Sequence, residues 1–246
     1  MRTCETPKWI SSSWTKKGEL HERQGLLCQA RTTYMERHSI QVIALTESRC
    51  SSDQSVLANE TLLEKTAEYF IKNAELWREN PKRDLKNKML IMVQNELEYL
   101  SLWYDLPRCD LGISVIAACV DHIKNRIHFF QYGKGCATIL TKNAQKIIVS
   151  DNIEIDHEIF FRIKGVMLFS ERSILTEMLK TEKQTRVSKE PAAMPYKRST
   201  SYFSEDQAAA ILIQEERAGN YGTKDAKQFL EKYDSLYTQQ KYHRMA

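Results

Sequence analysis

Three acidic residues stand at the ends of apolar, strand-like runs that lie far apart in the sequence. Glu47 closes the run IALTE, Glu171 closes VMLFSE, and Asp206 precedes AAAILI. Strand ends of one sheet core can bring distant carboxylates to a common edge, where their mutual repulsion requires a cation to relieve it. Oxygen-rich clusters of this type suit Mg²⁺ or Mn²⁺. The alternative is that each acid simply ends its strand in solvent, as most charged residues do.

Signatures of other common active sites do not occur in the chain. The sequence has no Walker A pattern, no GxGxxG after a strand, no HExxH and no GxSxG. The six cysteines are widely dispersed without a CxxC pair, so we expect reduced, mostly buried thiols. Four of the histidines lie in or beside strand-like stretches, and each alone is more typical of a structural residue than of a base or ligand. These four are His38, His122, His128 and His157.

Two amphipathic helices in succession are predicted in the first half of the chain. Apolar residues recur three and four positions apart over residues 56–79 and again over residues 85–103. Asp53 or Ser55 is the candidate N-cap of the first helix, and Pro107 stops the second.

Short β-branched and aliphatic runs predict strands on both sides of these helices. They cover residues 39–46, 113–120, 126–132, 137–140, 146–149, 165–170 and 208–213. The separators in the middle of the chain are short and polar, which favours an antiparallel meander over parallel crossovers. Strands, then helices, then strands indicate an α+β fold.

Two polar segments complete the chain. Residues 181–201 contain Pro191 and Pro195 and more basic than acidic side chains, which is typical of a solvated loop, with a docking loop as the alternative. From Thr223 onward, aromatic and aliphatic residues at helical spacing predict a C-terminal helical tail, residues 215–246. We expect this tail to pack on the body formed by residues 1–214, the alternative being that its aromatic stripe docks a partner.

Composition excludes some classes of protein. The chain has 246 residues, of which 42% are hydrophobic and 28% charged, as in an ordinary globular protein. A net charge of +4 is too small to predict binding to nucleic acid or to a membrane surface. A nucleic-acid adaptor using residues 181–201 is the weakest alternative. No signal sequence or long apolar run occurs, so a cytoplasmic location is expected.

Several short motifs follow one another in a recognisable order. The N-terminal part contains Ser11-Ser12-Ser13, Lys17-Gly18, His21, Gly25 and Cys28-Gln29-Ala30. Further along come VIALTES before a long helix, HFFQYGKG, Ser170-Glu171-Arg172 and Glu205-Asp206-Gln207-Ala208. In this order the chain resembles the metal-dependent, type-2C (PPM) protein phosphatases, especially their compact bacterial branch. The resemblance covers roughly residues 9–214 and implies a sandwich of two mainly antiparallel sheets flanked by helices.

The resemblance also implies a site. In the family, acids of these motifs hold a binuclear Mn²⁺ or Mg²⁺ centre whose bridging water attacks a phosphoester. Carried over by position, the metal ligands are Glu47, Glu171 and Asp206, with the backbone carbonyl of Ser48 as a further ligand. No phosphate-binding arginine is assigned, since Arg23 and Arg31 are both near the expected strand.

The chain departs from the family at each motif. Ala30 stands where the family has an aspartate that orients metal-bound water, unless that residue was lost in a short deletion. Lys134 replaces the aspartate of a weaker metal position, and Arg172 replaces a glycine beside it. Glutamate in place of aspartate at two ligand positions moves each carboxylate out by roughly 1.5 Å, whereas metal–oxygen distances tolerate about 0.2 Å. An equal alternative is that the side chains of Lys134 and Arg172 point into solvent and do not enter the metal site.

These departures predict a phosphatase-like domain with a weakened metal site. The preferred hypothesis is a weakly active or inactive phosphatase that binds a protein partner or phosphoprotein, with weak or absent Mn²⁺ or Mg²⁺ binding. The alternative is an active Mn²⁺- or Mg²⁺-dependent protein Ser/Thr phosphatase.

Overall fold

The computed structural model describes residues 8–48, 52–79, 84–107, 111, 113–133, 135–142, 146–149, 154–155, 160–170, 184–186 and 206–214. The strands are β1 (Trp9–Lys16), β2 (Ala30–Arg37), β3 (Ile40–Ser48), β4 (Ile113–Asp121), β5 (Arg126–Tyr132), β6 (Cys136–Thr141), β7 (Lys146–Val149), β8 (Glu154–Ile155), β9 (Ile163–Phe169), β10 (Gln184–Arg186) and β11 (Gln207–Gln214). The helices are α1 (Glu19–Arg23), α2 (Asp53–Lys72), α3 (Ala74–Glu79) and α4 (Asp84–Trp103).

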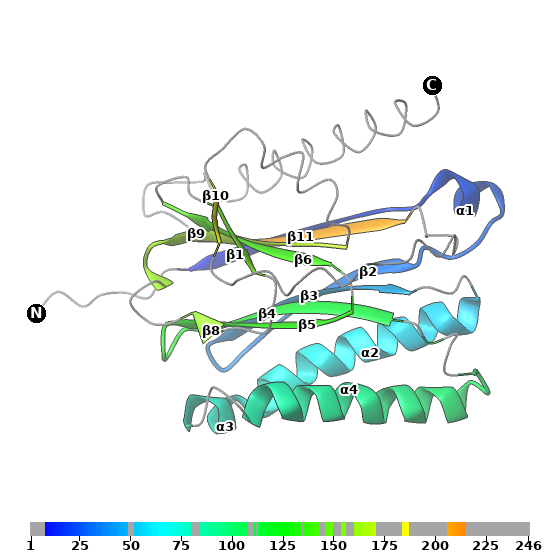
Figure 1. The fold of residues 1–246 in the computed structure, drawn as a ribbon, viewed down its shortest axis with the longest axis horizontal. Coiled ribbons are helices and arrows are strands. Elements are labelled where there is room, and N and C mark those ends of the chain that lie inside the picture. The colour runs from blue at the N-terminus through cyan, green and yellow to red at the C-terminus, as the bar shows by residue number, and fades with distance from the viewer. Residues whose placement is uncertain are drawn as a thin grey trace, which may run out of the picture.

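The strands form two sheets that pack face to face. One sheet has six strands in the order β1-β11-β9-β6-β7-β10, and the other has five in the order β2-β3-β4-β5-β8. All pairs are antiparallel except β10 with β7. Helices α2 and α4 cover the outer face of the five-stranded sheet (Figure 1). The α+β sandwich predicted from the sequence is confirmed.

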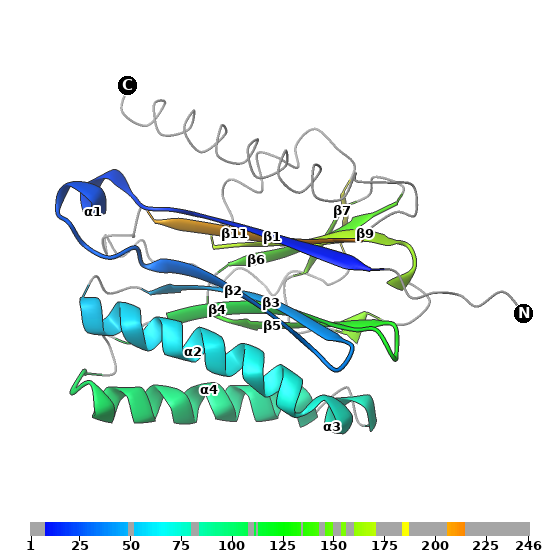
Figure 2. The same ribbon diagram turned by 180° about the vertical axis from the view of Figure 1, so that it is seen from behind.

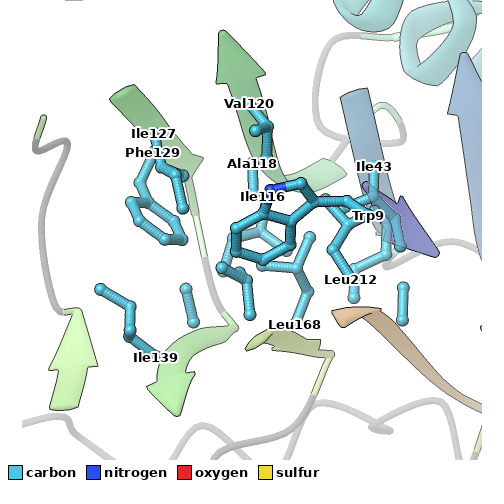
Figure 3. Close-up of a cluster of buried hydrophobic side chains, with 14 of the residues drawn as sticks. Trp9, Ile43, Ile116, Ala118, Val120, Ile127, Phe129, Ile139, Leu168 and Leu212 are labelled. Carbon is cyan, nitrogen blue, oxygen red and sulfur yellow. The ribbon is translucent and has the colours of Figure 1, made fainter. Parts of the chain in front are cut away.

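The first apolar core lies between the sheets. Side chains of Ile43 on β3 and Ile116 on β4 meet those of Leu168 on β9 and Leu212 on β11, and the indole of Trp9 fills the space beside them (Figure 3). All five residues are at most 2% exposed. This core holds together strands that are as far apart in sequence as β1 and β11.

The second core lies between the five-stranded sheet and the helices. Val42 and Ala44, which alternate with the inward residues of β3, pack with Leu62 and Phe70 of α2 and Val93 of α4. Both faces of β3 and β4 are therefore buried, which explains their nearly continuous apolar sequences. None of the helices in the described ranges combines the length and the apolar character needed to span a bilayer.

The end of the sandwich away from α1 is held by buried polar contacts. Arg78 of α3 forms a bidentate ion pair with Asp121 at the end of β4, at 3.0 and 3.3 Å. Gln41 of β3 donates its amide to the backbone oxygen of Trp9 at 3.1 Å, which links the two sheets. Burial lowers the pKa of His122, whose Nε2 lies 2.9 Å from Gln41 Oε1.

The helices differ from the sequence prediction at two points. The predicted helix over residues 56–79 is interrupted at Asn73, the C-cap of α2, and α3 follows as a separate helix. The N-cap is Ser52, whose hydroxyl accepts a hydrogen bond from Ser55 N, and not Asp53 or Ser55. Helix α4 agrees with its prediction within one residue.

The strand pairing also differs from a simple meander. The pairs β4–β5 and β6–β7 are antiparallel neighbours, but β5 and β6 belong to different sheets. The chain crosses between the sheets at Gly133 and Gly135, which both have positive φ, 81° and 125°. Strands β1 and β2 were not predicted from the sequence, and β10 lies within the segment 181–201 that was predicted to be a polar loop. The predicted tail, residues 215–246, lies outside the described residues, so the domain boundary proposed after residue 214 stays a prediction.

Candidate functional site

Strand ends gather at the end of the sandwich that carries α1 (Figure 1). In the five-stranded sheet, Glu47 of β3 lies between Ala30 of β2 and Ser114 of β4 in the register. The next residue, Ser48, is fully buried and donates its backbone N–H to the carbonyl of Gln29 at 3.1 Å. Glu47 itself is half-buried.

The six-stranded sheet ends at the same place. Ser170, just after β9, donates its N–H to the carbonyl of Ala208 at 3.0 Å, and its hydroxyl accepts from Ala208 N at 2.9 Å. Asp206 directly precedes β11, the strand that contains Ala208. Gly133 lies so close to Ser114 that a Cβ added to it would be 3.1 Å from Ser114 Cα. The ends of β3, β5 and β9 and the starts of β4 and β11 therefore lie together at one end of the sandwich.

At this end of the sandwich, the carboxylate of Asp206 is the acceptor shared by three hydrogen bonds. Its carboxylate accepts from Gly18 N at 2.5 Å, from Gln29 N at 2.6 Å and from His21 Nδ1 at 3.0 Å. Asp206 is 1% exposed. Because a carboxylate only accepts hydrogen bonds, the His21 proton facing it is on Nδ1. The side chain of Asp206 thus fixes both ends and the middle of residues 18–29, the segment that contains α1.

The local sequence explains this contact. Lys16 at the end of β1 pairs with Gln207 at the start of β11, so the chain leaves β1 beside Asp206. Gly18 follows two residues later and presents its N–H to the carboxylate. The short helix α1 then turns the chain back toward the start of β2.

Gln29 connects Asp206 to the other sheet. Its N–H bonds Asp206, and its carbonyl accepts from Ser48 N and from Asn59 Nδ2, the latter at 3.0 Å. Thr46 Oγ1 contacts Asn59 Oδ1 and lies 2.7 Å from the carbonyl oxygen of Ser114. Gln29 Oε1 is buried without a hydrogen-bond partner. A polar network therefore runs from β11 through β2 and β3 to α2.

The remaining predicted site residues have different outcomes. Ala30 is fully buried in the core between the sheets. Glu171, Lys134 and Arg172 lie outside the described residues. Their neighbours Ser170, Gly133 and Gly135 do lie at the α1 end of the sandwich.

The two arginines considered for phosphate binding are placed differently. Arg31 Nε pairs with Glu60 of α2, and its Nη1 donates to the carbonyl of Ala30 at 3.2 Å. Arg23 is exposed at the end of α1. The guanidinium of Arg31, a candidate for phosphate binding, is therefore already paired with the carboxylate of Glu60.

Cys28 lies next to this network. Burial raises the pKa of its thiol above the ordinary value, the hydrogen bond with Ala30 opposes this, and the charge of Asp206 adds to the increase. The nucleophile of cysteine is its thiolate. A raised pKa disfavours the thiolate, so this shift makes Cys28 less nucleophilic than an ordinary cysteine.

Sequence reasoning did not assign His21, Gly18, Gln29, Thr46 or Asn59 to the site. Gly18, His21 and Gln29 are in the motif quoted for the family resemblance, and this was the available signal. Their contact with Asp206 spans 177 to 188 residues of sequence and involves mostly backbone donors, which no residue pattern specifies.

We tested whether these residues fit a two-ion centre. Metal ions of this class need oxygen ligands with lone pairs directed at the ion. The carboxylate of Asp206 already accepts three hydrogen bonds, and Ala30 offers no ligand atom. The described residues include no group of three or more His, Cys, Asp or Glu side chains that could hold a metal ion. Of the three ligands that the resemblance implies, the described residues place Glu47 and Asp206 at this end of the sandwich, and the Asp206 carboxylate is already hydrogen-bonded there.

Comparisons with known proteins give a fold but no sequence family. No family model and no curated protein matches the chain. A bacterial serine phosphatase carrying an arginine substitution matches with a TM-score of 0.50 and 11% identity, over 85% of this chain and 100% of that one. The RsbU and RsbW domains of a Mycobacterium tuberculosis protein match with a TM-score of 0.50 and 7% identity, over 94% and 71%. RsbX in complex with magnesium matches with a TM-score of 0.47 and 7% identity, over 84% and 96%.

The sheet order and the two likenesses with a TM-score of 0.50 define the fold class. The chain has the fold of the PPM-type serine phosphatases, as the sequence resemblance predicts. At these identities the likeness is one of fold, so the chain is described as a phosphatase-like domain.

Proposed function

We propose that the protein is a regulatory, protein-binding module built on a phosphatase fold, with weak or absent phosphatase activity. Its partner is a protein, with a phosphoprotein as the specific class that the fold favours. The candidate metal ligands Glu47, Glu171 and Asp206 then form a site that binds Mn²⁺ or Mg²⁺ weakly or not at all.

The observation that carries this proposal is the bonding of Asp206. Its carboxylate accepts hydrogen bonds from Gly18 N, Gln29 N and His21 Nδ1 inside the protein. Hydrogen bonds to a charged group contribute roughly 1.5 to 3 kcal/mol each. A divalent ion would have to compete with this set for the same oxygens, at the cost of releasing residues 18–29.

Two substitutions support the same conclusion. Ala30 puts a methyl group where the resemblance has a water-orienting aspartate, and loss of such outer contacts commonly lowers metal affinity or activity 10- to 100-fold. Lys134 brings an ammonium group where the resemblance has an acid, and a fixed cation repels a divalent ion.

An active Mn²⁺- or Mg²⁺-dependent phosphatase is the second candidate. It is favoured by the convergence of Glu47, Ser48 and Asp206 at one end of the sandwich. Gln29 Oε1, buried without a hydrogen-bond partner, adds an acceptor there. This candidate requires Glu47 to act as a ligand.

The decisive experiment measures hydrolysis of p-nitrophenyl phosphate and of a phosphoserine peptide with added Mn²⁺, for the wild type and for Glu47→Gln. Glu47→Gln is the informative variant because Glu47 is half-buried and lies at a strand end, so the fold is expected to persist. We expect the wild type to hydrolyse neither substrate faster than Glu47→Gln does. We also expect calorimetry to show no saturable binding of Mn²⁺ to the wild type. Turnover that disappears in a folded Glu47→Gln protein would refute the proposal.

A charge substitution tests the role of Lys134. Calorimetry with Mn²⁺ on Lys134→Asp is compared with Lys124→Asp, which makes the same change in the turn between β4 and β5 at the opposite end. We expect Lys134→Asp to strengthen Mn²⁺ binding and Lys124→Asp to leave it unchanged. If the two variants behave alike, Lys134 does not occupy the site.

A further inference from the structure

We propose that the exposed side of α4 binds the same side of α4 in a second copy of the chain. The two helices run antiparallel, and Asn95 of each copy lies on the twofold axis between them. The inference goes beyond the proposed function and does not depend on it, because it requires neither a metal ion nor hydrolysis.

Helix α4 carries apolar residues on two of its sides. Met89, Val93 and Leu100 are buried in the core between the helices and the five-stranded sheet. Four large apolar residues of the same helix are exposed although α4 lies along the outer surface of the helical layer (Figure 2). They are Ile91, Tyr99, Leu102 and Trp103, which are 55%, 54%, 84% and 70% exposed. Apolar residues on both sides are typical of a helix that is covered on both sides.

The exposed residues of α4 form one row along the helix, which we call the α4 row. Ile91, Asn95, Tyr99 and Trp103 follow one another at intervals of four, and Leu102 lies seven residues after Asn95. Residues at these intervals share one face of a helix. The rings of Tyr99 and Trp103 stack with their centroids 5.9 Å apart and an angle of 23° between their planes. The row is therefore a continuous surface, about 18 Å long, with Asn95 in it as a polar residue.

The exposed area of the α4 row is close to what a dimer requires. Its four apolar residues expose on the order of 500 Å². A patch of this size is among the largest that monomeric proteins expose. A standard interface buries about 800 Å² on each partner. Lys88, Asn95 and Glu98 are exposed beside the apolar residues and supply the remaining polar area. The contact is then about 60% apolar, similar to homodimer interfaces, which are about 65% apolar.

The order of residues in the α4 row is self-complementary, which identifies the partner as a second copy. Asn95 lies four residues after Ile91 and four before Tyr99, so a twofold axis at Asn95 places Ile91 of each copy against Tyr99 of the other. The same axis places Leu102 against the aliphatic stem of Lys88 in the other copy.

Asn95 itself suits a position on the axis. A carboxamide has both donors and an acceptor, so two of them that meet on the axis satisfy each other. In paired helices, a single asparagine in an apolar row fixes the register and the number of helices at some cost in stability. The chemistry of Asn95 therefore favours one antiparallel register of two copies.

The proposed dimer is weak. Its area only reaches the standard size and includes a buried polar pair, so we expect a dissociation constant on the order of 10 to 100 µM. At about 1 µM, a concentration suitable for spectroscopic unfolding, the chain is then monomeric by mass action.

The test is sedimentation equilibrium of the full chain from about 1 to about 300 µM, which spans the expected dissociation constant. We expect the average mass to rise from that of a monomer toward that of a dimer. Asn95→Asp and Asn95→Lys each place two like charges on the axis, so each alone is expected to dimerise at least about tenfold more weakly. An equimolar mixture of the two variants is expected to regain the dimer, because opposite charges then meet. This rescue requires residue 95 of one copy to meet residue 95 of the other.

The controls are Ser13→Asp and Ser13→Lys, which make comparable charge changes at an exposed position of β1 in the other sheet. We expect both to dimerise as the wild type does. Asn95 is also exposed, so the Asn95 variants are expected to fold, and circular dichroism checks their helix content.

Three results would overturn the inference. A monomer at every concentration would show that the α4 row is not covered by a second copy, which would leave it to a different protein. A dimer that Asn95→Asp leaves unchanged would assign the contact to another surface. A mixture of folded Asn95→Asp and Asn95→Lys proteins that stays monomeric would exclude an axis at Asn95. None of these results bears on the Mn²⁺ and hydrolysis experiments, so failure here is distinguishable from failure of the proposed function.

Discussion

The carboxylate of Asp206 orders a segment that has little regular secondary structure of its own. Residues 18–29 contain only a five-residue helix, and two backbone N–H groups and one imidazole of this segment bond Asp206. Buried backbone donors need acceptors, and a charged acceptor forms the strongest of such bonds. The role of Asp206 visible in this structure is to position α1.

Asp206→Asn is expected to destabilise the protein by about 2 to 4 kcal/mol, because an amide replaces one acceptor oxygen with a donor that faces other donors. Urea unfolding monitored by circular dichroism measures the change. Asp105→Asn is the control, since Asp105 is exposed with φ of 50°, a conformation that asparagine tolerates. An Asp206→Asn protein as stable as the control would contradict this role.

His128 gives the stability a pH dependence. Burial lowers its pKa to about 4, with the charge of Asp121 opposing and that of Arg126 adding to the shift. The unfolded chain takes up the proton near the ordinary pKa of about 6.5, so this contribution to stability falls as pH decreases from about 6.5 to about 4. The loss at about pH 4.5, relative to about pH 7.5, is about 2 to 3 kcal/mol. Urea unfolding of the wild type and of His128→Asn at both pH values tests it. An identical pH dependence in the two proteins would contradict it.

At the scale of elements, the passage between the two sheets depends on Gly133. Its φ is 81°, and an added Cβ would lie 2.7 Å from Ser114 Oγ and 3.1 Å from Ser114 Cα. Gly25 also has positive φ, 67°, but nothing lies within 4 Å of an added Cβ. A comparison of alanine substitutions at the two glycines therefore separates the free-energy cost of the backbone conformation from the cost of steric overlap.

Gly25→Ala is expected to cost about 1 kcal/mol, the penalty for a left-handed alanine. Gly133→Ala is expected to cost a further 1 to 3 kcal/mol or so because of overpacking against Ser114. Thermal unfolding of both variants measures the difference. Equal losses would show that the turn relaxes without strain.

Elements with strong periodicity could be predicted from the sequence, and those without it could not. Helix α4 and the buried strands β3 and β4 have apolar patterns imposed by the cores. Strands β1 and β2 are edge strands with many Ser, Thr and charged residues, so no such pattern marks them. The break at Asn73 was also not predicted, because apolar residues at helical spacing continue on both sides of it.

The site was predictable only in outline. Glu47, Ser48 and Asp206 could be proposed as site residues because acids at strand ends and the family resemblance indicate those positions, and the structure places all three at one end of the sandwich. The donors to Asp206 could not be derived, since two of the three are backbone groups whose chemistry is the same in every residue. The placement of Asp206 depends on the register of β1 with β11, which follows from the complete fold.

At the scale of the whole molecule, the two cores share one sheet. Alternate residues of β3 and β4 enter the core between the sheets and the core under the helices. Loss of either core exposes one face of the same strands. We therefore expect the sandwich and the helical layer to unfold together.

Leu62→Ala tests this coupling. Leu62 is fully buried under α2, and its truncation is expected to cost about 2 to 5 kcal/mol. Helical circular dichroism and tryptophan fluorescence should show coincident transitions, both shifted to the same lower urea concentration. Leu102→Ala is the control, since Leu102 on α4 is 84% exposed. A fluorescence transition that stays at its original midpoint while the helical signal shifts would show independent layers.

The bond from Gly18 to Asp206 has a consequence for biosynthesis. Its two partners are 188 residues apart, so the ribosome must add nearly the whole chain before the acceptor exists. At 5 to 20 residues per second this delay is roughly 10 to 40 s. During that interval the early segment and β1, whose strand partner β11 also comes late, are exposed to chaperones and proteases in the cell.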